Sequence, residues 1–217
     1  MKTLFSAIIF SVLIFSCKPE NKSRGEFSIS DTVIQRLQIY YKLDSFDAQG
    51  NVRYHTIPAM ELTAQNGKPF QTNSYEGKVS LTDFFFASCQ GICPRMTSQF
   101  TRVQNVFRGN PDFKMVSYTV DPSRDTAEFL QQYAMQYNAD TAQWKFVTGS
   151  KKSLYDLARY GYLLPVQAGT GDSEDFIHSD QLVLVDRKSR IRGYYNGTDS
   201  AAVDSLIEDI KILLKEK

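Results

Sequence analysis

Cys89 and Cys93 lie in the stretch SCQGICPRM, residues 88–96, and are the strongest candidates for chemistry in this chain. Pro94 is favoured in the first turn of a helix, so the stretch predicts that Cys93 lies at a helix cap and Cys89 in the preceding loop. The positive end of a helix dipole stabilises a thiolate, and Arg95 adds a positive charge nearby. We therefore expect at least one thiol with a lowered pKa, suited to disulfide exchange or to metal binding.

A structural disulfide between Cys89 and Cys93 is the alternative to a reactive pair. It would close a very short loop, and the chain-entropy gain from a disulfide grows with the logarithm of loop length. The stabilisation would be small, so we favour a reactive or metal-binding pair. Two thiols do not separate redox exchange from metal binding, and a third ligand has to be considered.

Two histidines are available as that third ligand. His55 follows Tyr54 in an alternating apolar and polar pattern, and we expect a half-exposed strand residue there. His178 follows residues 165–177, PVQAGTGDSEDFI, which have no helical or strand period, and it precedes an apolar strand pattern. Long irregular segments in compact domains are usually binding elements. From spacing alone a surface histidine is the default interpretation of His178, and a metal ligand is the alternative.

The composition sets the class of protein. The 217 residues are 42% hydrophobic and 23% charged, which suits one ordinary globular domain. Lys and Arg number 25 against 24 Asp and Glu, for a net charge of +1, so the balance gives no electrostatic reason to expect nucleic acid as a partner. With three Cys and two His, a disulfide-rich scaffold and a module with several zinc sites are excluded.

The N-terminus predicts targeting rather than folding. Residues 1–16 have a basic start and an apolar run at residues 4–15, which is too short to span a bilayer comfortably and is typical of a signal peptide. The next residue, Cys17, resembles the acylated first residue of a bacterial lipoprotein, and a plain secretory signal is the alternative. Residues 17–38 are mostly polar and predict a solvated tether. The lipid would hold residues 39–217 at a membrane, outside the cytoplasm.

The hydrophobic periodicity predicts an α/β fold. An alternating pattern around a Gln-Gly-Asn turn at residues 39–57 predicts a β-hairpin. Strands are then expected at residues 79–87, 113–120, 144–148, 182–185 and 191–195, and helices at residues 94–108, 127–137, 152–160 and 201–214. This order is typical of a thioredoxin-like domain in which helices flank a mixed central sheet, here with an N-terminal β-hairpin extension. In such a sheet the loop before residues 182–185 faces the cysteine loop, so His178 could reach the thiols.

Acidic residues follow the second of these strands. Asp121 and Asp125 should lie at the same end of the sheet as the cysteines. Their structural interpretation is a turn and a helix start, with Asp125 or Thr126 as the helix cap. Docking of a partner or tuning of the cysteines by Asp121 is the alternative.

Several motifs together resemble the Sco/SenC family of copper-delivery proteins. They are DFFFASCQGICPRM, then YTVDPSRDT at residues 118–126, then HSDQLVLVD and IRGYYNGTD, and the resemblance runs from about residue 57 to residue 199. It implies a thioredoxin-like fold and copper bound by two cysteines and one histidine, which by motif position are Cys89, Cys93 and His178. The family assists assembly of the dicopper CuA centre of cytochrome c oxidase, and its members are also proposed to act as thiol-disulfide reductants.

The donor set agrees with that implication. Two thiolates and an imidazole suit Cu(I), and with a further weak ligand they can hold Cu(II). Structural zinc would need a fourth ligand such as Asp121 or Asp180, so zinc ranks below copper. The sequence departs from many relatives at residues 90–92, Gln-Gly-Ile, where they place Pro-Thr, and at Arg95, where Lys is common. Arg95 is therefore a second candidate for partner contact or tuning.

We expect a lipid-anchored copper chaperone on the periplasmic side of a bacterial cell envelope. It would pass copper to the CuA-bearing subunit of the oxidase, with other copper carriers or thiol reductants as further partners. The main alternative is a thiol-disulfide reductase that acts on cysteines of the oxidase subunit or of exported proteins. A copper or redox sensor is a third, weaker hypothesis. Whether the protein is an enzyme stays open at this point.

Overall fold

The computed structural model describes residues 37–164 and 179–216. The expected signal segment at residues 1–16, Cys17, the tether up to residue 36 and His178 fall outside these ranges. None of the helices in the described part of the chain has both the length and the apolar character needed to cross a bilayer.

A β-hairpin opens the described chain, as the alternating pattern predicts. Strands β1 (Lys42–Phe46) and β2 (Val52–Tyr54) pair antiparallel in a two-stranded sheet of their own. The carboxylate of Asp47 accepts a hydrogen bond from the backbone N–H of Asn51 at 2.8 Å, which closes the connecting turn.

A seven-stranded mixed sheet forms the centre of the fold, in the order β4-β3-β7-β6-β5-β8-β9. Strands β5, β6 and β7 are parallel to one another, whereas β3 and β8 run antiparallel to their neighbours. The sheet is therefore mixed, as predicted. The bounds are β3 (Glu61–Ala64), β4 (Pro69–Gln71), β5 (Val79–Phe85), β6 (Phe113–Thr119), β7 (Trp144–Thr148), β8 (Gln181–Val185) and β9 (Ile191–Asn196).

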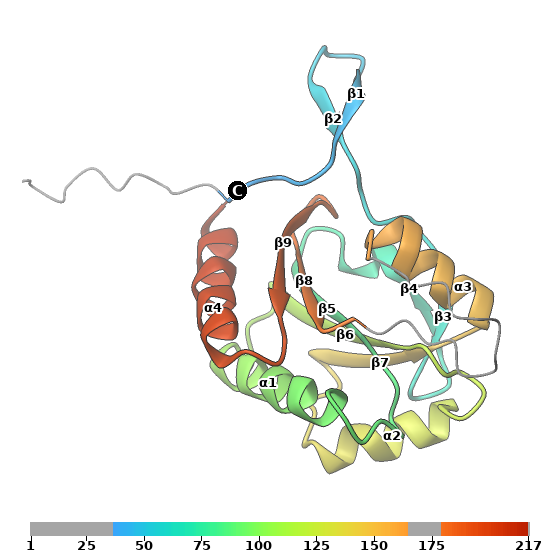
Figure 1. The fold of residues 1–217 in the computed structure, drawn as a ribbon. Helices are drawn as coiled ribbons and strands as arrows, with labels where there is room; N and C mark the ends of the chain where they lie inside the picture. The colour runs from blue at the N-terminus through green and yellow to red at the C-terminus, as the bar shows by residue number, and fades with distance from the viewer. Residues whose placement is uncertain (1–36, 165–178, 217) are drawn as a thin grey trace, which may run out of the picture. The chain divides into compact units, whose positions relative to one another are not determined.

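Helices cover both faces of this sheet (Figure 1). Buried side chains of α1, α2 and α4 pack in one apolar cluster, and those of α3 and η2 pack in another on the opposite face. Their bounds are η1 (Thr72–Tyr75), α1 (Cys93–Val106), α2 (Ala127–Gln136), α3 (Lys151–Asp156), η2 (Leu157–Gly161) and α4 (Ser200–Lys215). The expected α/β architecture, in which helices flank a mixed central sheet, is confirmed.

Strand β5 explains why both clusters form. All of its residues are buried, and neighbouring side chains point to opposite faces. Leu81 and Phe85 belong to the cluster under α1, whereas Phe84 belongs to the cluster under α3. A nearly continuous apolar run is the pattern expected of a strand covered on both faces.

One predicted helix is irregular. The pattern at residues 152–160 predicts a single short helix with a cap at Ser150, and the Ser150 hydroxyl does accept the Ser153 N–H. The α-helical part ends at Asp156, however, and the chain continues as the π-helical turn η2. The backbone carbonyl of Gly161 then lies 2.7 Å from Nε2 of His55, a contact that the periodicity of the segment does not reveal.

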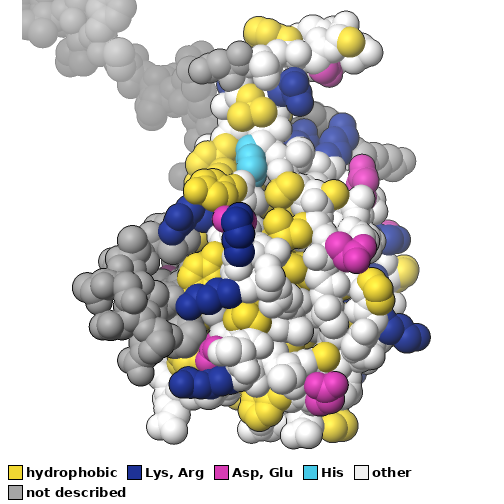
Figure 2. Space-filling view, turned by 90° about the vertical axis from the view of Figure 1, so that its right-hand side faces the viewer, with side chains coloured by type: hydrophobic (Ala, Val, Ile, Leu, Met, Phe, Trp, Pro, Cys, Tyr) yellow, Lys and Arg dark blue, Asp and Glu magenta, His cyan; other side chains and the backbone are white. Residues whose placement is uncertain are grey.

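Charged side chains are dispersed over the face of the molecule that Figure 2 draws. On the face shown in Figure 2, basic and acidic side chains lie between apolar and neutral ones rather than in one continuous basic area. This distribution agrees with the net charge of +1.

Candidate metal centre

The cysteine loop leads from β5 into α1. Helix α1 starts at Cys93, and its N-cap is Ile92, which has helical backbone angles. The prediction that Cys93 is the cap is therefore wrong by one residue, and Pro94 occupies the second helical position. Pro94 fits there because the first N–H groups of a helix have no partner within it. Cys89 lies in the loop, as predicted, and its N–H donates to the Phe86 carbonyl at 3.2 Å.

The sulfur of Cys89 accepts several hydrogen bonds. Cys89 is half-buried, and burial by itself raises the pKa of its thiol. The backbone N–H and the thiol of Cys93, together with the N–H groups of Gly91 and Ile92, outweigh that effect and bring the pKa of Cys89 below its ordinary value. Backbone N–H groups at the helix start, rather than the Arg95 charge, are the main stabilising contacts.

Cys93 behaves in the opposite way. Its side chain is 4% exposed, and this burial is the main reason why the pKa of its thiol rises to about 12. The hydrogen bond to Cys89 and the negative charges of Cys89 and Asp83 raise it further, while the Phe86 N–H opposes the rise. The pair is therefore asymmetric. Cys89 loses its proton first, and the Cys93 thiol donates a hydrogen bond to the resulting thiolate.

Asp125 anchors the start of the cysteine loop. Its side chain is fully buried, and Oδ2 accepts the Ala87 N–H at 3.0 Å and the Thr119 hydroxyl at 2.5 Å. Burial raises the pKa of Asp125 although both of these hydrogen bonds lower it. Asp125 is not the helix cap, because Thr126 caps α2 by accepting the Phe129 N–H. No periodicity in the sequence signals this contact, because it joins segments that follow different strands.

The Asp121 carboxylate contacts residues of the turn in which it lies. It is 5% exposed, and its Oδ1 accepts the Ser123 hydroxyl at 2.7 Å. Nη1 of Arg124 lies 3.5 Å from Oδ2. These contacts match the structural interpretation of a turn before a helix. A direct role toward a partner or the thiols stays a prediction.

Asp83 is a candidate that the sequence interpretation missed. It is 1% exposed in the middle of β5, opposite Ser117 of β6 and on the sheet face that α1 covers. Burial raises the pKa of Asp83 to about 7, against the lowering effect of the Ser117 side chain. The signal available in the sequence was an acidic residue inside the otherwise apolar run at residues 79–87.

Of the two candidate histidine ligands, the structure describes His55 but not His178. His55 directly follows β2 and is half-buried, with its ring against Tyr41 at a centroid distance of 6.5 Å and its Nε2 at the Gly161 carbonyl. These contacts indicate that His55 has a structural role. His178 lies outside the described residues, and its role as a ligand stays a prediction. Within the described ranges, no three His, Cys, Asp or Glu side chains are grouped so as to hold a metal ion.

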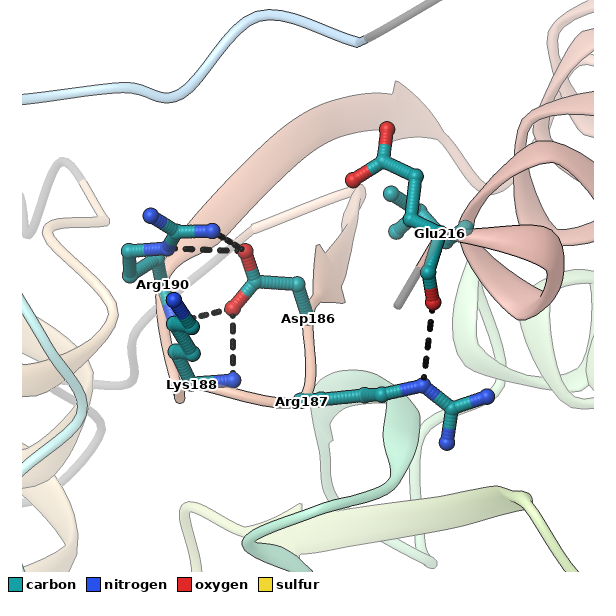
Figure 3. A pocket seen from close by; sticks show the side chains of 6 residues that line it. Asp186, Arg187, Lys188, Arg190 and Glu216 are labelled. Atoms are coloured by element: carbon teal, nitrogen blue, oxygen red, sulfur yellow. Dashed lines mark hydrogen bonds and ion pairs between the residues drawn. The ribbon is translucent and has the colours of Figure 1, made fainter. Parts of the chain in front are cut away.

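A small cavity elsewhere in the fold does not compete with this site. It measures about 40 Å³ and lies between the β8–β9 turn and the end of α4, lined by Asp186, Arg187, Lys188, Arg190, Leu213 and Glu216. Figure 3 shows that its charged groups face one another, with Arg190 against Asp186 and Arg187 against the Glu216 carbonyl. A cavity of this size holds water at most. The candidate chemistry therefore stays at the cysteine loop.

The structure thus defines a thioredoxin-like domain with an asymmetric pair of cysteines at the start of its first helix. The family model described as SCO1/SenC matches residues 48–215, and the chain belongs to this family. The resemblance of the sequence motifs is confirmed.

Three known proteins illustrate the similarity. The solved SCO1/SenC family lipoprotein from Bacillus anthracis is 28% identical, with a TM-score of 0.67 over 74% of this chain and 96% of that one. BsSco, described as a member of the Sco family of cytochrome c oxidase assembly proteins with a disulfide switch, is 29% identical, with a TM-score of 0.64 over 75% and 95% of the two chains. A protein of Stutzerimonas stutzeri that is named for copper binding is 32% identical over 65% of this chain and 70% of its own.

Proposed function

We propose that this chain binds copper through Cys89, Cys93 and His178 and delivers it to the CuA centre of cytochrome c oxidase. The observation that carries the proposal is the hydrogen-bonded pair of free thiols at the start of α1 in a chain of the SCO1/SenC family. The name of the Stutzerimonas relative supports copper, and the description of BsSco supports a role in oxidase assembly.

The donors fit copper as a cargo. Soft thiolates select Cu(I), and an imidazole completes a set of three donors that also suits Cu(II) when a weak ligand is added. Metal binding requires both thiols to lose their protons, and the raised pKa of Cys93 means that loading releases a proton from that thiol at neutral pH. The same set lacks the fourth protein ligand of structural zinc.

The strand topology supports His178 as the third ligand. Strand β8 runs antiparallel to β5, with Val185 opposite Ser80 and Val183 opposite Thr82. The first residues of β8 therefore lie toward the end of β5 from which the cysteine loop starts. Ser179, the residue after His178, is buried at this start of β8.

The proposal includes a lipid anchor at Cys17 that holds the domain on the periplasmic side of a membrane. The basic and apolar character of residues 1–16 and the lipoprotein description of the Bacillus anthracis relative support it. Two or more acyl chains would give stable attachment where one would not.

Copper titration of the soluble form, residues 18–217, tests the ligand set. We expect about one copper ion per chain for the wild-type protein, since one set of donors is present. His178→Ala should lower the affinity by at least about tenfold, because the loss of a ligand should cost no less than the loss of an outer-shell partner, which typically costs about 10–100-fold. His55→Ala is the matched control, because it removes the other histidine of the chain and should leave copper binding unchanged. Unchanged affinity in His178→Ala would exclude His178 as a ligand.

A thiol-disulfide reductase is the second candidate, and the asymmetry of the cysteine pair favours it. The Cys89 thiolate would attack a client disulfide, which forms a mixed disulfide and releases one client thiolate. Cys93 would then lose its proton and attack Cys89, which frees the second client thiol and leaves a Cys89–Cys93 disulfide. Two electrons pass to the client, and an external thiol reductant must restore the pair.

His178→Ala also separates these two functions. A reductase needs only the thiols, so disulfide exchange should survive in His178→Ala while copper affinity falls. Cys93→Ala should trap the mixed disulfide of a reductase, because the resolving thiol is absent. Normal oxidase assembly in cells that carry a double variant of Cys89 and Cys93 would contradict both candidates.

A further inference from the structure

A groove runs beside the first two turns of the cysteine helix. It is an open groove of about 470 Å³ between α1 and the segment that joins β9 to the start of α4. Its lining residues are Pro94, Arg95, Ser98, Gln99, Thr198 and Ser200. None of these is acidic, one is cationic, and most of the others carry hydroxyl or amide groups. Pro94 directly follows Cys93 in the chain, so the groove begins one residue from the cysteine pair.

Arg95 has spare binding capacity. It is exposed, and within the described residues its guanidinium makes one hydrogen bond, from Nη2 to the Thr198 carbonyl at 3.1 Å, and no ion pair. Arg102, two turns further along α1, is by contrast paired with Asp204 of α4. A guanidinium has five N–H donors in a fork that matches a carboxylate, so Arg95 can still bind one.

A chain of hydrogen bonds holds Arg95 at the groove. Asn196 donates to the Asp180 carboxylate at 2.8 Å, and its own carbonyl accepts the Thr198 N–H at 2.8 Å. The Thr198 hydroxyl donates to the same Asn196 oxygen at 2.7 Å. The Thr198 carbonyl is thereby fixed where Arg95 donates to it. These contacts connect the Arg95 guanidinium, through Thr198 and Asn196, to Asp180 just before β8. The guanidinium is therefore held by the backbone of the β9–α4 loop.

We infer that this groove docks an acidic, extended segment of the protein that exchanges copper or a disulfide with Cys89 and Cys93. The inference rests on the proposed function, because it places the partner's segment next to the exchanging thiols. Arg95 binds a carboxylate of the segment, and the hydroxyl and amide groups of Ser98, Gln99 and Thr198 bind its backbone. Opposite charge favours encounter, and the groove sets the direction from which the partner approaches the thiols.

The test measures disulfide exchange with a probe of defined charge. The probe is a short peptide whose single cysteine carries a coloured thiol leaving group, made with a run of Glu or a run of Lys beside the cysteine. The Cys89 thiolate attacks the peptide sulfur, a Cys89–peptide disulfide forms, and the coloured thiolate leaves. We expect Arg95→Glu to lower the ratio of the Glu-peptide rate to the Lys-peptide rate by roughly tenfold at low ionic strength. Rates with neutral dipyridyl disulfide report whether the thiol itself has changed.

Arg108→Glu is the matched control, since Arg108 is exposed in the turn just after the far end of the same helix and the net charge changes equally. It should alter the ratio by less than about twofold, because exposed charges beyond a Debye length are screened. Equal effects of Arg95→Glu and Arg108→Glu, or no effect of either, would overturn the inference.

A steric variant and a copper titration complete the design. Ser98→Trp should fill the groove and slow both peptides while the rate with dipyridyl disulfide is kept; unchanged peptide rates would show that the groove is not used. Failure of the proposed function is distinguishable, because it would appear as absence of copper binding by the wild-type chain. Failure of the groove would appear as equal rates with the Glu peptide and the Lys peptide in a wild-type chain that binds copper.

Discussion

The buried carboxylate of Asp125 accepts a hydrogen bond from the N–H of Ala87 at 3.0 Å. Ala87 lies just after β5, and Asp125 lies between β6 and α2, so this contact joins the two segments at the edge of the sheet where the cysteine loop begins. The loop is thus held at its start by a side chain from another element and at its end by the first turn of α1.

Removal of this anchor should loosen the loop. Asp125→Ala leaves the Ala87 N–H and the Thr119 hydroxyl without their acceptor, and we expect a loss of roughly 1–3 kcal/mol in the free energy of unfolding. Asp125→Asn keeps one acceptor oxygen and should cost less. Urea denaturation measures both values. Equal stability of Asp125→Ala and the wild-type protein would show that the contact does not hold the loop.

The cysteine pair should react in a fixed order. Because the pKa of Cys89 is lowered and that of Cys93 is raised to about 12, iodoacetamide at neutral pH should label Cys89 first. Peptide mapping by mass spectrometry after short exposure distinguishes the two sites. In Cys89→Ser, the remaining thiol should react slowly because its side chain is 4% exposed. Equal labelling of both cysteines in the wild-type protein would contradict the asymmetry.

Asp83 should make stability depend on pH. Its pKa is about 7 in the folded protein and near 3.8 when exposed, so between these values the folded state keeps a proton that the unfolded state releases. Stability therefore falls as the pH rises through this window, by roughly 1.4 kcal/mol per pH unit, and levels off above about pH 7. Asp83→Asn removes this contribution. Its free energy of unfolding relative to the wild-type protein should rise by roughly 2–3 kcal/mol between pH 5 and pH 8.

Denaturation curves of both proteins at several pH values provide that measurement. Parallel profiles for Asp83→Asn and the wild-type protein would show that the carboxyl group of Asp83 does not titrate in this range.

Arg192 should be a main contributor to stability at the opposite end of the sheet. It is 4% exposed, it bonds both Glu216 oxygens at 2.8 and 3.0 Å, and its Nη1 lies 3.1 Å from Asp186. It also donates to the carbonyl groups of Leu37 and Gln38, which attaches the start of the described chain to β9. Arg192→Leu leaves buried acceptors unpaired and should cost roughly 3–5 kcal/mol.

Thermal melting and limited proteolysis before residue 40 monitor this change. The control is Lys211→Ala on α4, whose ion pair with Glu208 is exposed and should contribute little. Similar melting temperatures for Arg192→Leu and Lys211→Ala would contradict the assignment.

Short-range sequence patterns were sufficient to predict the helices, the strands of the hairpin and of the sheet centre, and the reactive cysteine pair. The helical stripe of Met96, Phe100 and Val103 and the apolar run of β5 depend on neighbours along the chain, so their structures could be predicted from spacing. Cys89 and Cys93 share one loop and one helix start, so a reactive pair could be predicted from spacing, whereas the raised pKa of Cys93 depends on its burial in the core.

Contacts between distant segments needed the tertiary structure. The bond from Ala87 to Asp125, the approach of Thr198 to Arg95 and the burial of Asp83 opposite Ser117 each join residues on different elements. Their positions depend on strand order and on how the helices pack, and no short-range periodicity encodes these features. Sequence alone determined which residues could do chemistry, and tertiary packing decided which of them are buried, paired or left free to bind a partner.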